Sequence, residues 1–417
     1  MNKKTVRDVD LKGKRVIMRV DFNVPIKDGQ VTDDTRIQAA LPTIKHVLAQ
    51  GGSLVLMSHL GRPKGKGYEA EFSLKPAADK LAALLGKPVG FAADCLKAEA
   101  EVAALKPGQL LMLENTRFYK EEEGKAKTEG LSDDEAKAKK TEMKDRQKAM
   151  AKTLASYGDI YVNDAFGSAH RAHASTAVIC KFITEKGGAN VAGFLMEKEI
   201  QYLAQAIANP GRPFVAIIGG AKVSGKLEVL RSLMEKVDTI LIGGGMAYTF
   251  LKALGHEIGN SLVENELIDT AKETLALAKT KKVNFLLPVD NVAADKFDNA
   301  AQIKTVGQDI PVGWMALDIG PKAVAEYTAA VAQAKTIVWN GPMGCFEMPN
   351  FAAGTTAICR AVADSGAVSI IGGGDSVAAV NQSGLADKMT HISTGGGASL
   401  ELLEGKQLPG VVALDNQ

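Results

Sequence analysis

The chain has 417 residues, too many for one hydrophobic core, so we expect two domains. Its composition, 46% hydrophobic and 24% charged, is that of an ordinary globular protein, and the net charge of +2 argues against a partner such as nucleic acid or a membrane surface. We expect neither a signal peptide nor a membrane span, since no apolar run approaches about 18 residues. The four cysteines form no C-x-x-C pair, which favours reduced, buried thiols in a cytoplasmic protein.

The first half of the chain alternates strand-like and helical patterns. Helices are expected at 35–50 and 75–86. Strands are expected at the nearly continuous apolar runs 15–22, 53–60, 109–116 and 159–166. Such runs are typical of a parallel sheet with helices on both faces, where ligands bind beyond the carboxyl ends of the strands.

Polar and basic residues follow each of these predicted strands. They are Asp21 and Asn23 after the first, His59 and Arg62 after the second, Arg117 after the third, and His170, Arg171 and His173 after the fourth, with Arg36 opening the first helix. Each arginine alone is also compatible with a solvated or salt-bridged side chain. Their shared position after adjacent strands predicts one pocket for a small polyanion, because arginine binds carboxylate and phosphate through two hydrogen bonds.

Residues 120–152 differ from the rest of the half by their dense, balanced charge. Ser132 and Glu135 form a capping box, and Met143 and Met150 lie on one face of the helix that follows. We interpret the segment as a solvated helical insertion packed on one side. A protein- or RNA-binding arm is the alternative, although mixed charge argues against nucleic acid.

The second half repeats the alternation, and five of its apolar runs stop at glycine-rich turns. These are VAIIGGAKVSGK (215–226), TILIGGGMAYTF (239–250), TIVWNGPMG (336–344), VSIIGGGDSV (368–377) and HISTGGGAS (391–399). Bare backbone N–H groups at the start of a helix attract phosphate. The turns therefore predict a polyphosphate site. Between the halves, an amphipathic helix ending at Asn209-Pro210-Gly211 is the expected connection.

The turn GGAKVSGKL (219–227) nearly matches the P-loop pattern but has Leu227 where a hydroxyl should bind magnesium. Lys222 and Lys226 still form a good phosphate clamp, although two surface lysines at a helix start are the alternative. The dinucleotide pattern G-x-G-x-x-G is absent, since Tyr248 occupies its third glycine position. Asp375 and Ser376 could simply cap a helix, or Asp375 could hold a metal bound to phosphate.

Together these strings resemble the phosphoglycerate kinase family. The motifs RVDFNVP, SHLGRP, EN-x-RF, DAFGSAHRAH, GGAKVSGK, GGGMA, WNGPMG-x-FE, GGGDS and TGGGA occur in the family's order over essentially the whole chain. The resemblance implies two doubly wound, parallel-sheet (Rossmann-like) α/β domains joined by a hinge helix. Residues 1–194 would bind 3-phosphoglycerate, residues 195–399 would bind the nucleotide, and the tail 400–417 would pack back on the first domain.

The same resemblance implies reversible phosphoryl transfer from 1,3-bisphosphoglycerate to MgADP, giving 3-phosphoglycerate and MgATP, in a glycolytic, monomeric enzyme. On the substrate side, Asp21, Asn23 and Arg36 would hold the carboxyl end and hydroxyl, and His59, Arg62, Arg117 and Arg171 the other phosphate. On the nucleotide side it implies Lys222, Lys226, Gly244, Asn340, Glu347, Gly372, Gly373, Gly374, Asp375 and Ser376, with magnesium on Asp375. Cys345, and Ser376 in place of threonine, are small departures from the family pattern.

Phosphoryl transfer needs positioning and charge neutralisation rather than a protein nucleophile. We therefore expect Arg36 and Lys222 as the catalytic clamps, aided by the N–H groups of 372–374, after closure of the two domains. Another nucleotide-dependent small-molecule kinase is the enzymatic alternative. An RNA-binding module is the non-enzymatic one, which 5% aromatic residues and the small net charge disfavour.

Overall fold

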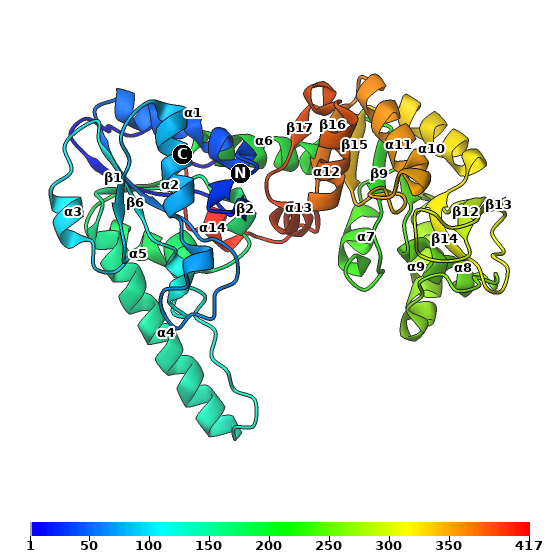
Figure 1. Cartoon of the computed structure of the whole chain (residues 1–417), viewed down its shortest axis with the longest axis horizontal. Helices are drawn as coiled ribbons and strands as arrows, with labels where there is room; N and C mark the ends of the chain where they lie inside the picture. The colour runs from blue at the N-terminus through cyan, green and yellow to red at the C-terminus, as the bar shows by residue number, and fades with distance from the viewer. Residues whose placement is uncertain (1) are drawn as a thin grey trace. The chain divides into compact units, whose positions relative to one another are not determined.

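The computed structural model describes residues 2–417, except for the side chains of residues 205–207. The chain forms two compact units (Figure 1). Unit 1 contains the residues up to Gln201 together with Gln407–Gln417, and unit 2 is Tyr202–Lys406. The division falls inside helix α6 (Phe194–Ala208), whereas the sequence placed it at 194/195. A continuous helix carries no local signal of where its packing partners change.

Unit 1 is built on a six-stranded parallel sheet of order β5-β6-β4-β1-β7-β8. In that order the strands are Gly90–Ala92, Leu110–Leu113, Ser53–Met57, Arg15–Arg19, Ile160–Asn163 and Asn190–Ala192. Four of them lie within the predicted apolar runs, but each ends before its run does. The remaining residues of each run leave the sheet and form the loops at its carboxyl edge.

Helices cover this sheet because successive strand residues are buried on opposite faces. Val16 and Met18 of β1 pack with Ile37 and Ile44 of α1 on one face, while Ile17 is equally buried on the other. The helices of unit 1 are α1 (Thr35–Ala49), α2 (Lys75–Leu85), α3 (Glu99–Ala103), α4 (Asp133–Ser156), α5 (Ile179–Glu185) and α14 (Pro409–Val412). The first two match the predicted helices.

Unit 2 repeats the plan with a parallel sheet of order β11-β10-β9-β15-β16-β17. Its strands are Asn284–Leu286, Thr239–Ile242, Phe214–Ile218, Thr336–Asn340, Val368–Gly372 and His391–Ile392. Its helices are α7 (Leu227–Leu233), α8 (Met246–Ala253), α9 (Ile268–Thr280), α10 (Pro321–Gln333), α11 (Ala353–Asp364), α12 (Gly374–Ser383) and α13 (Gly396–Leu403). The predicted fold class, two doubly wound parallel sheets, is confirmed.

Two small antiparallel sheets were not predicted. One joins β12 (Asn291–Ala294) to β13 (Ile303–Val306) and β14 (Met315–Ile319), and the other is the hairpin of β2 (Ile26–Lys27) and β3 (Gln30–Val31). These strands are short, and the exposed β13 alternates only weakly in polarity. Strands of this kind depend on pairing partners more than on local pattern.

The C-terminal segment that belongs to unit 1 begins at Gln407, while the expected tail began at 400. Its backbone joins the edge of the unit 1 sheet, since Asp415 N donates to Asn190 O at 2.9 Å and Lys4 N donates to Asp415 O at 2.9 Å. Asn163 Nδ2 at the end of β7 donates to Gly410 O at 3.1 Å. Residues 400–403 instead form the end of α13 in unit 2.

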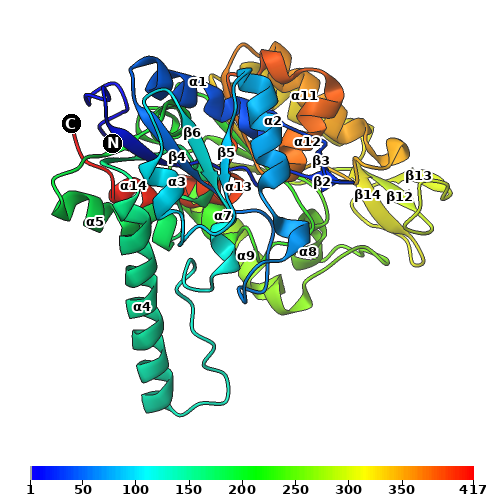
Figure 2. The ribbon, with the colours of Figure 1, turned by 60° about the vertical axis from the view of Figure 1, so that its left-hand side comes forward.

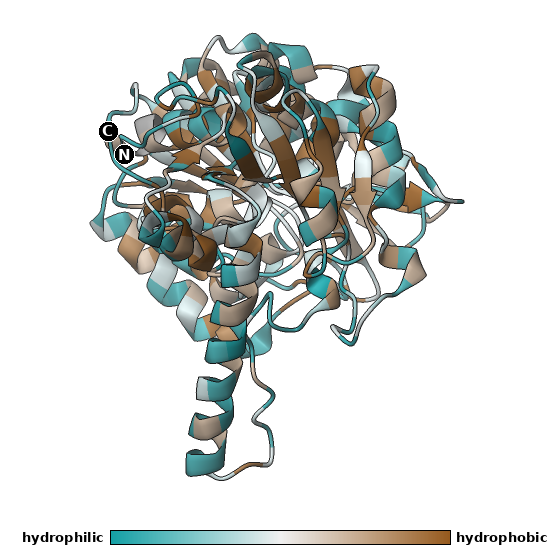
Figure 3. Ribbon diagram, turned by 90° about the vertical axis from the view of Figure 1, so that its left-hand side faces the viewer, coloured by the Kyte–Doolittle hydropathy of each residue, from teal (hydrophilic) through white to brown (hydrophobic). Residues whose placement is uncertain are grey.

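Helix α4 projects from unit 1 beside the segment that leads into it (Figure 2). The expected capping box at Ser132 and Glu135 is present, and the buried residues include Met143, Met150 and Leu154 as predicted. The projecting end of the helix is mostly hydrophilic (Figure 3). Within residues 2–417, no helix combines the length and apolar character needed to cross a membrane.

The sheet order determines where a ligand can bind in each unit. In unit 1 the chain builds outward from β1 in one direction through β4 and then returns to the other side with β7. In unit 2 the corresponding reversal lies between β9 and β15. Loops at such a reversal separate and leave a crevice beyond the carboxyl ends of the strands, which is the usual ligand site of doubly wound sheets.

Candidate active site

The loop after β1 begins the unit 1 site. Arg36, in the first turn of α1, places Nη1 3.0 Å from the Asp21 carboxylate. Asn23 Oδ1 accepts a hydrogen bond from Gly61 N at 2.8 Å. The loops after β1 and β4 are therefore tied together, and Arg36 keeps part of its guanidinium in solvent, where it can meet a ligand.

The loops after β4 and β6 add further cations to this edge. Arg117 Nη1 donates to Gly61 O at 3.0 Å, and its Nε lies 3.6 Å from Glu123 Oε1. Arg62 is exposed, while His59 is buried with 6% of its surface accessible. Burial lowers the pKa of Arg117, with nearby Arg19 and Arg171 acting in the same direction. Like charges are thus gathered at the carboxyl end of the sheet.

The loop after β7 supplies Arg171 between two histidines. Arg171 Nε donates to His170 Nε2 at 3.0 Å, and since arginine is only a donor, the proton of His170 lies on Nδ1. Burial, reinforced by Arg117, Arg19 and Arg171, lowers the pKa of His173 to about 3. The pKa of His170 is also lowered by burial. Both rings are therefore neutral donors within a strongly positive environment.

Three buried polar residues behind this site were not singled out from the sequence. Arg19, Glu122 and Ser175 are each fully buried. Arg19 looked like part of an apolar strand, and Glu122 was assigned to the solvated charged segment, which is wrong for that residue. The one local signal was the position of Arg19 immediately before the loop that carries Asp21.

The unit 2 site is a pocket of about 390 Å³ at the reversal between β9 and β15. Its lining includes most of the predicted nucleotide residues: Lys222, Lys226, Asn340, Gly373, Gly374, Asp375 and Ser376. Gly372 ends β16 beside it. Gly244 lies against Gly220, a lining residue, and Glu347 is exposed outside the pocket lining.

Glycine is required where the strand-end loops of this pocket meet. Gly341 has φ of 100°, and a Cβ there would lie 2.0 Å from Gly219 O. Gly373 has φ of 91°, and a Cβ there would lie 2.9 Å from Asn340 Nδ2. Backbone N–H groups and carbonyls therefore form the walls, because no side chain fits between the loops.

Polar groups of the pocket remain available for an anion. Lys226 Nζ donates to Asn340 Oδ1, while the buried Asn340 Nδ2 makes no hydrogen bond among the described residues. Burial lowers the pKa of Lys226, and Asp375 partly opposes that change. Ser376 Oγ accepts from Gly341 N at 2.6 Å, so its hydroxyl supports the loop after β15. Lys222 is exposed at the rim.

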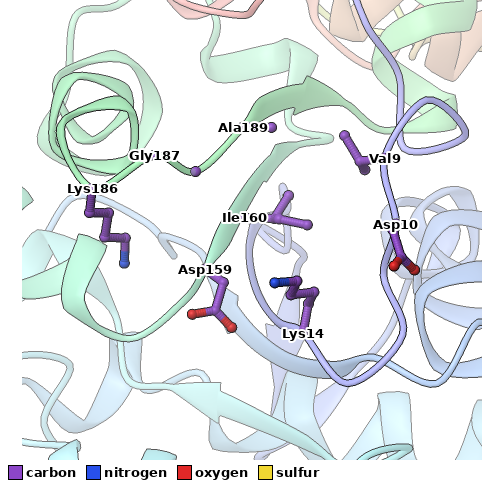
Figure 4. Close-up of a pocket in the computed structure, with 9 residues that line it drawn as sticks. Val9, Asp10, Lys14, Asp159, Ile160, Lys186, Gly187 and Ala189 are labelled. Atoms are coloured by element: carbon purple, nitrogen blue, oxygen red, sulfur yellow. The ribbon is translucent and has the colours of Figure 1, made fainter.

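A second pocket, of about 340 Å³, lies at the amino ends of β7 and β8 in unit 1 (Figure 4). Two of its charged groups are already engaged. Lys186 Nζ donates to the carbonyls of Ala155 and Gly158, and Asp159 Oδ2 accepts from Arg15 N at 2.8 Å. This pocket therefore offers no convergent set of free polar groups.

Comparison with known proteins identifies the family of this chain. The family model described as Phosphoglycerate kinase matches residues 6–406. Curated relatives named phosphoglycerate kinase include those of Chloroherpeton thalassium, 56% identical, and Koribacter versatilis, 55% identical, each with full coverage of both chains. A solved phosphoglycerate kinase from Coxiella burnetii superposes with a TM-score of 0.85 at 42% identity, covering 99% of this chain and 98% of that one.

The sheet orders, the two sites and these relatives lead to one assignment. The chain belongs to the phosphoglycerate kinase family, the glycolytic kinases that transfer phosphate between a nucleotide and a carboxyl group of phosphoglycerate.

Proposed function

We propose that unit 1 binds phosphoglycerate and that unit 2 binds ADP or ATP. The observation that carries this division is the contrast between the two sheet reversals. In unit 1 the edge of the sheet gathers arginines and histidines, whereas in unit 2 it forms a glycine-walled pocket with Lys226 and an unpaired Asn340 amide. A compact polyanion suits the first arrangement, and a polyphosphate chain along bare backbone suits the second.

On the substrate side, we assign the carboxyl end and hydroxyl of the glycerate to Asp21, Asn23 and Arg36. The non-transferred phosphate is assigned to His59, Arg62, Arg117 and Arg171. Two properties support this assignment. Arg36, Arg62 and Arg117 follow three strands whose loops are hydrogen-bonded to one another through Gly61, and Arg171 comes from the loop after β7. Neutral histidines among them add donors without adding repulsion.

On the nucleotide side, Lys222 and Lys226 would contact the phosphates and the migrating group. Gly244 would line the adenine pocket, and Asn340 and Glu347 would serve nucleotide binding, with Glu347 at the ribose. The loop Gly372, Gly373 and Gly374 would direct its N–H groups at the phosphates. Ser376 would act there mainly through the loop after β15, because its oxygen already accepts from Gly341 N.

Magnesium is assigned to Asp375. This carboxylate is exposed in the first turn of α12 and lines the nucleotide pocket. Protein-bound magnesium commonly takes one or two carboxylates and completes its shell with substrate phosphates and water. The ion would neutralise phosphate charge there, and Asp375 would keep it on the pocket side of the helix.

The transfer itself needs no protein nucleophile, because a carboxylate oxygen or an ADP oxygen attacks the phosphorus directly. Arg36 from unit 1 and Lys222 from unit 2 would neutralise the equatorial oxygens, with the N–H groups of 372–374 adding to them. The reaction requires the two ligands to meet in line with water excluded, so we propose that hinge closure precedes transfer.

A cytoplasmic monomer is the state we propose for this enzyme. The four cysteines are free thiols, three of them buried and Cys345 half-buried. Unpaired thiols persist in reducing compartments. Size-exclusion chromatography with light scattering at micromolar concentration should give the 44.0 kDa mass of one chain.

The division of labour can be tested with one variant in each unit. Arg171→Ala should raise KM for 3-phosphoglycerate about 30-fold or more, the effect of losing roughly 2 kcal/mol, while KM for MgATP changes less than threefold. Lys226→Ala should show the reverse pattern. Equal losses for both substrates in either variant would contradict the proposed division.

A further inference from the structure

Glu122 is the least expected residue of the charged segment that follows Arg117. Its side chain is fully buried, although the surrounding sequence is highly polar. Its backbone is held on both sides, since Ala174 N donates to Glu122 O at 2.9 Å and Gln147 Nε2 donates to the same oxygen at 3.1 Å. Gln147 also donates to Ala172 O at 3.1 Å. The base of α4 thus joins Glu122 to the loop that carries Arg171.

Among the described residues, Ser175 makes the hydrogen bonds to the Glu122 carboxylate, and His173 Nδ1 lies 3.9 Å from its Oε1. Ser175 Oγ donates to Glu122 Oε1 at 2.5 Å, and Ser175 N donates to Oε2 at 3.1 Å. Ser175 lies in the π-helical turn Ala174–Val178. The hydroxyl accepts in turn from Arg19 Nε at 2.8 Å. A buried carboxylate and a buried guanidinium are therefore connected through one hydroxyl, and each supplies the counter-charge that the other needs.

Arg19 connects Ser175 and Glu122 to His59 in the proposed substrate site. Its Nη2 lies 3.0 Å from His59 Nδ1, and its Nη1 donates to Val20 O. Arginine has no acceptor atom, so His59 must present the Nδ1 lone pair to it. His59 is then neutral, and its remaining proton sits on Nε2. Burial, followed by Arg19, Arg117, His173 and Arg36, lowers the pKa of His59 well below its ordinary value, which agrees with this tautomer.

We propose that Glu122 and Ser175 are positioning residues for phosphoglycerate, because they orient Arg19 and thereby hold His59 as a neutral donor through Nε2–H. The inference rests on the proposed role of His59 at the substrate phosphate. In this arrangement the fully buried Arg19 does not contact substrate. It fixes the ring orientation and the position of one proton, and Glu122 makes the burial of its charge possible.

The chain contains a matched serine–glutamate pair that serves as control. Ser73 Oγ donates to the buried Glu114 Oε2 at 2.6 Å, and Leu74 N donates to Oε1 at 2.8 Å. This pair lies at the start of α2, where the Ser73 hydroxyl accepts from Lys75 N at 3.3 Å, and no arginine among the described residues donates to it. Ser73→Ala and Ser175→Ala each remove one hydroxyl from a buried carboxylate in unit 1. A difference between the two variants therefore reports the connection to Arg19 rather than the loss of a buried hydrogen bond.

The experiment measures KM for 3-phosphoglycerate, KM for MgATP and kcat for Ser175→Ala, Glu122→Gln, Ser73→Ala and the unmodified protein. Ser175→Ala and Glu122→Gln should each raise KM for 3-phosphoglycerate about tenfold, with KM for MgATP unchanged within twofold. Ser73→Ala should leave both KM values within twofold. If Ser175→Ala and Ser73→Ala shift the kinetics equally, the proposal is wrong. Glu122→Gln, which preserves volume, decides the matter if Ser175→Ala does not fold.

A spectroscopic readout separates positioning from general stability. Nitrogen-15 NMR of labelled histidine at pH 7 should show His59 as the Nε2–H tautomer in the unmodified protein and in Ser73→Ala, but as a mixture of tautomers in Ser175→Ala. An unchanged His59 signal in Ser175→Ala would overturn the proposal.

The double variant His59→Ala with Ser175→Ala tests the route of action. Its KM for 3-phosphoglycerate should match that of His59→Ala alone, because residues acting through one another are not additive. If the KM increases of the two single variants multiply in the double variant, Ser175 does not act through His59. If His59→Ala itself leaves this KM unchanged, the assignment of the substrate site fails instead, so the two failures can be distinguished.

Discussion

The two units place their ligand groups at the same point of the same type of sheet but build them from different chemistry. Unit 1 gathers side-chain cations such as Arg36, which is paired with the buried Asp21. Unit 2 uses loop backbone brought so close together that only glycine fits, with Lys222 and Lys226 as the cations of its pocket. A shared topology therefore determines where a ligand binds, while the loops determine what is bound.

The contrast between the two units predicts that kcat falls more when a single cation is lost from unit 2 than when one is lost from unit 1. Lys222→Ala should lower kcat about 10²–10³-fold, the scale of one lost electrostatic contact to a transition state, and Lys222→Arg should restore only part of it. Dissociation constants for both substrates should change much less. Rapid-quench kinetics and separate binding titrations provide these values. A strongly raised dissociation constant for ATP with unchanged kcat would make Lys222 a ground-state anchor instead.

The loops that wall the unit 2 pocket should not tolerate an added methyl group. Gly341→Ala would place a Cβ 2.0 Å from Gly219 O at a φ of 100°, so one of the two loops must move. We expect a loss of about 3–5 kcal/mol in the free energy of unfolding and about 10²-fold in turnover. Gly366→Ala is the control, since Gly366 also has positive φ, 66°, but open space around it. Similar losses in urea denaturation of both variants would show that backbone strain alone is responsible.

Each unit contains a buried aspartate that accepts helix N–H groups and has a raised pKa, and these two carboxyls should respond alike to pH. Asp164 Oδ1 accepts from Leu195 N and Met196 N at the start of α6, and Asp318 Oδ2 accepts from Gly354 N at the start of α11. Burial raises the pKa of Asp164 and of Asp318 to about 7. Between about pH 4 and 7 these two carboxyls therefore bind more protons in the folded protein than in the unfolded chain, and their contribution to stability falls as pH rises.

Replacement by asparagine should remove this dependence. Between pH 5 and 7, the unmodified protein should lose about 2–3 kcal/mol more unfolding free energy than Asp164→Asn or Asp318→Asn. Urea denaturation at each pH measures the difference. A parallel pH profile in all three proteins would show that neither carboxyl titrates in this range.

The smallest effect is expected in the projecting arm of unit 1. Replacing residues 127–141 with a short glycine–serine linker should leave both KM values and kcat within twofold. The replaced residues, the start of α4 and the segment that leads into it, are mostly exposed. The deletion must spare Glu122, whose burial places the segment 121–125 outside the solvated arm. Extending the deletion to include Glu122 should raise KM for 3-phosphoglycerate. If the two deletion variants have equal KM values for 3-phosphoglycerate, Glu122 belongs functionally to the solvated arm.

Much of this molecule could be predicted from local pattern. The apolar runs that became β1, β4, β6 and β7, the helices α1 and α2, and the capping box of α4 all depend on contacts within a few residues. The glycine-walled loops of the unit 2 pocket could also be predicted, because glycine-rich turns after buried strands leave backbone N–H groups exposed.

The residues that escaped prediction depend on contacts distant in sequence. Arg19 and Ser175 are separated by 156 positions and Glu122 and Ser175 by 53, so no window of sequence reveals either pair. Glu122 also lies among half-buried glutamates and exposed lysines that give it no distinguishing pattern. The antiparallel strands β12, β13 and β14 were missed because pairing stabilises them more than their composition does.

The sequence by itself determined the alternation of strands and helices, the glycine loops and the residue types at the strand ends, since each follows from local periodicity and backbone chemistry. Only the tertiary structure decided which strands are neighbours, and so where the two reversals lie. It also decided which charges are buried. The cost of burying Arg19 and Glu122 is offset only when folding brings Ser175 between them, a condition that no single segment of the chain encodes.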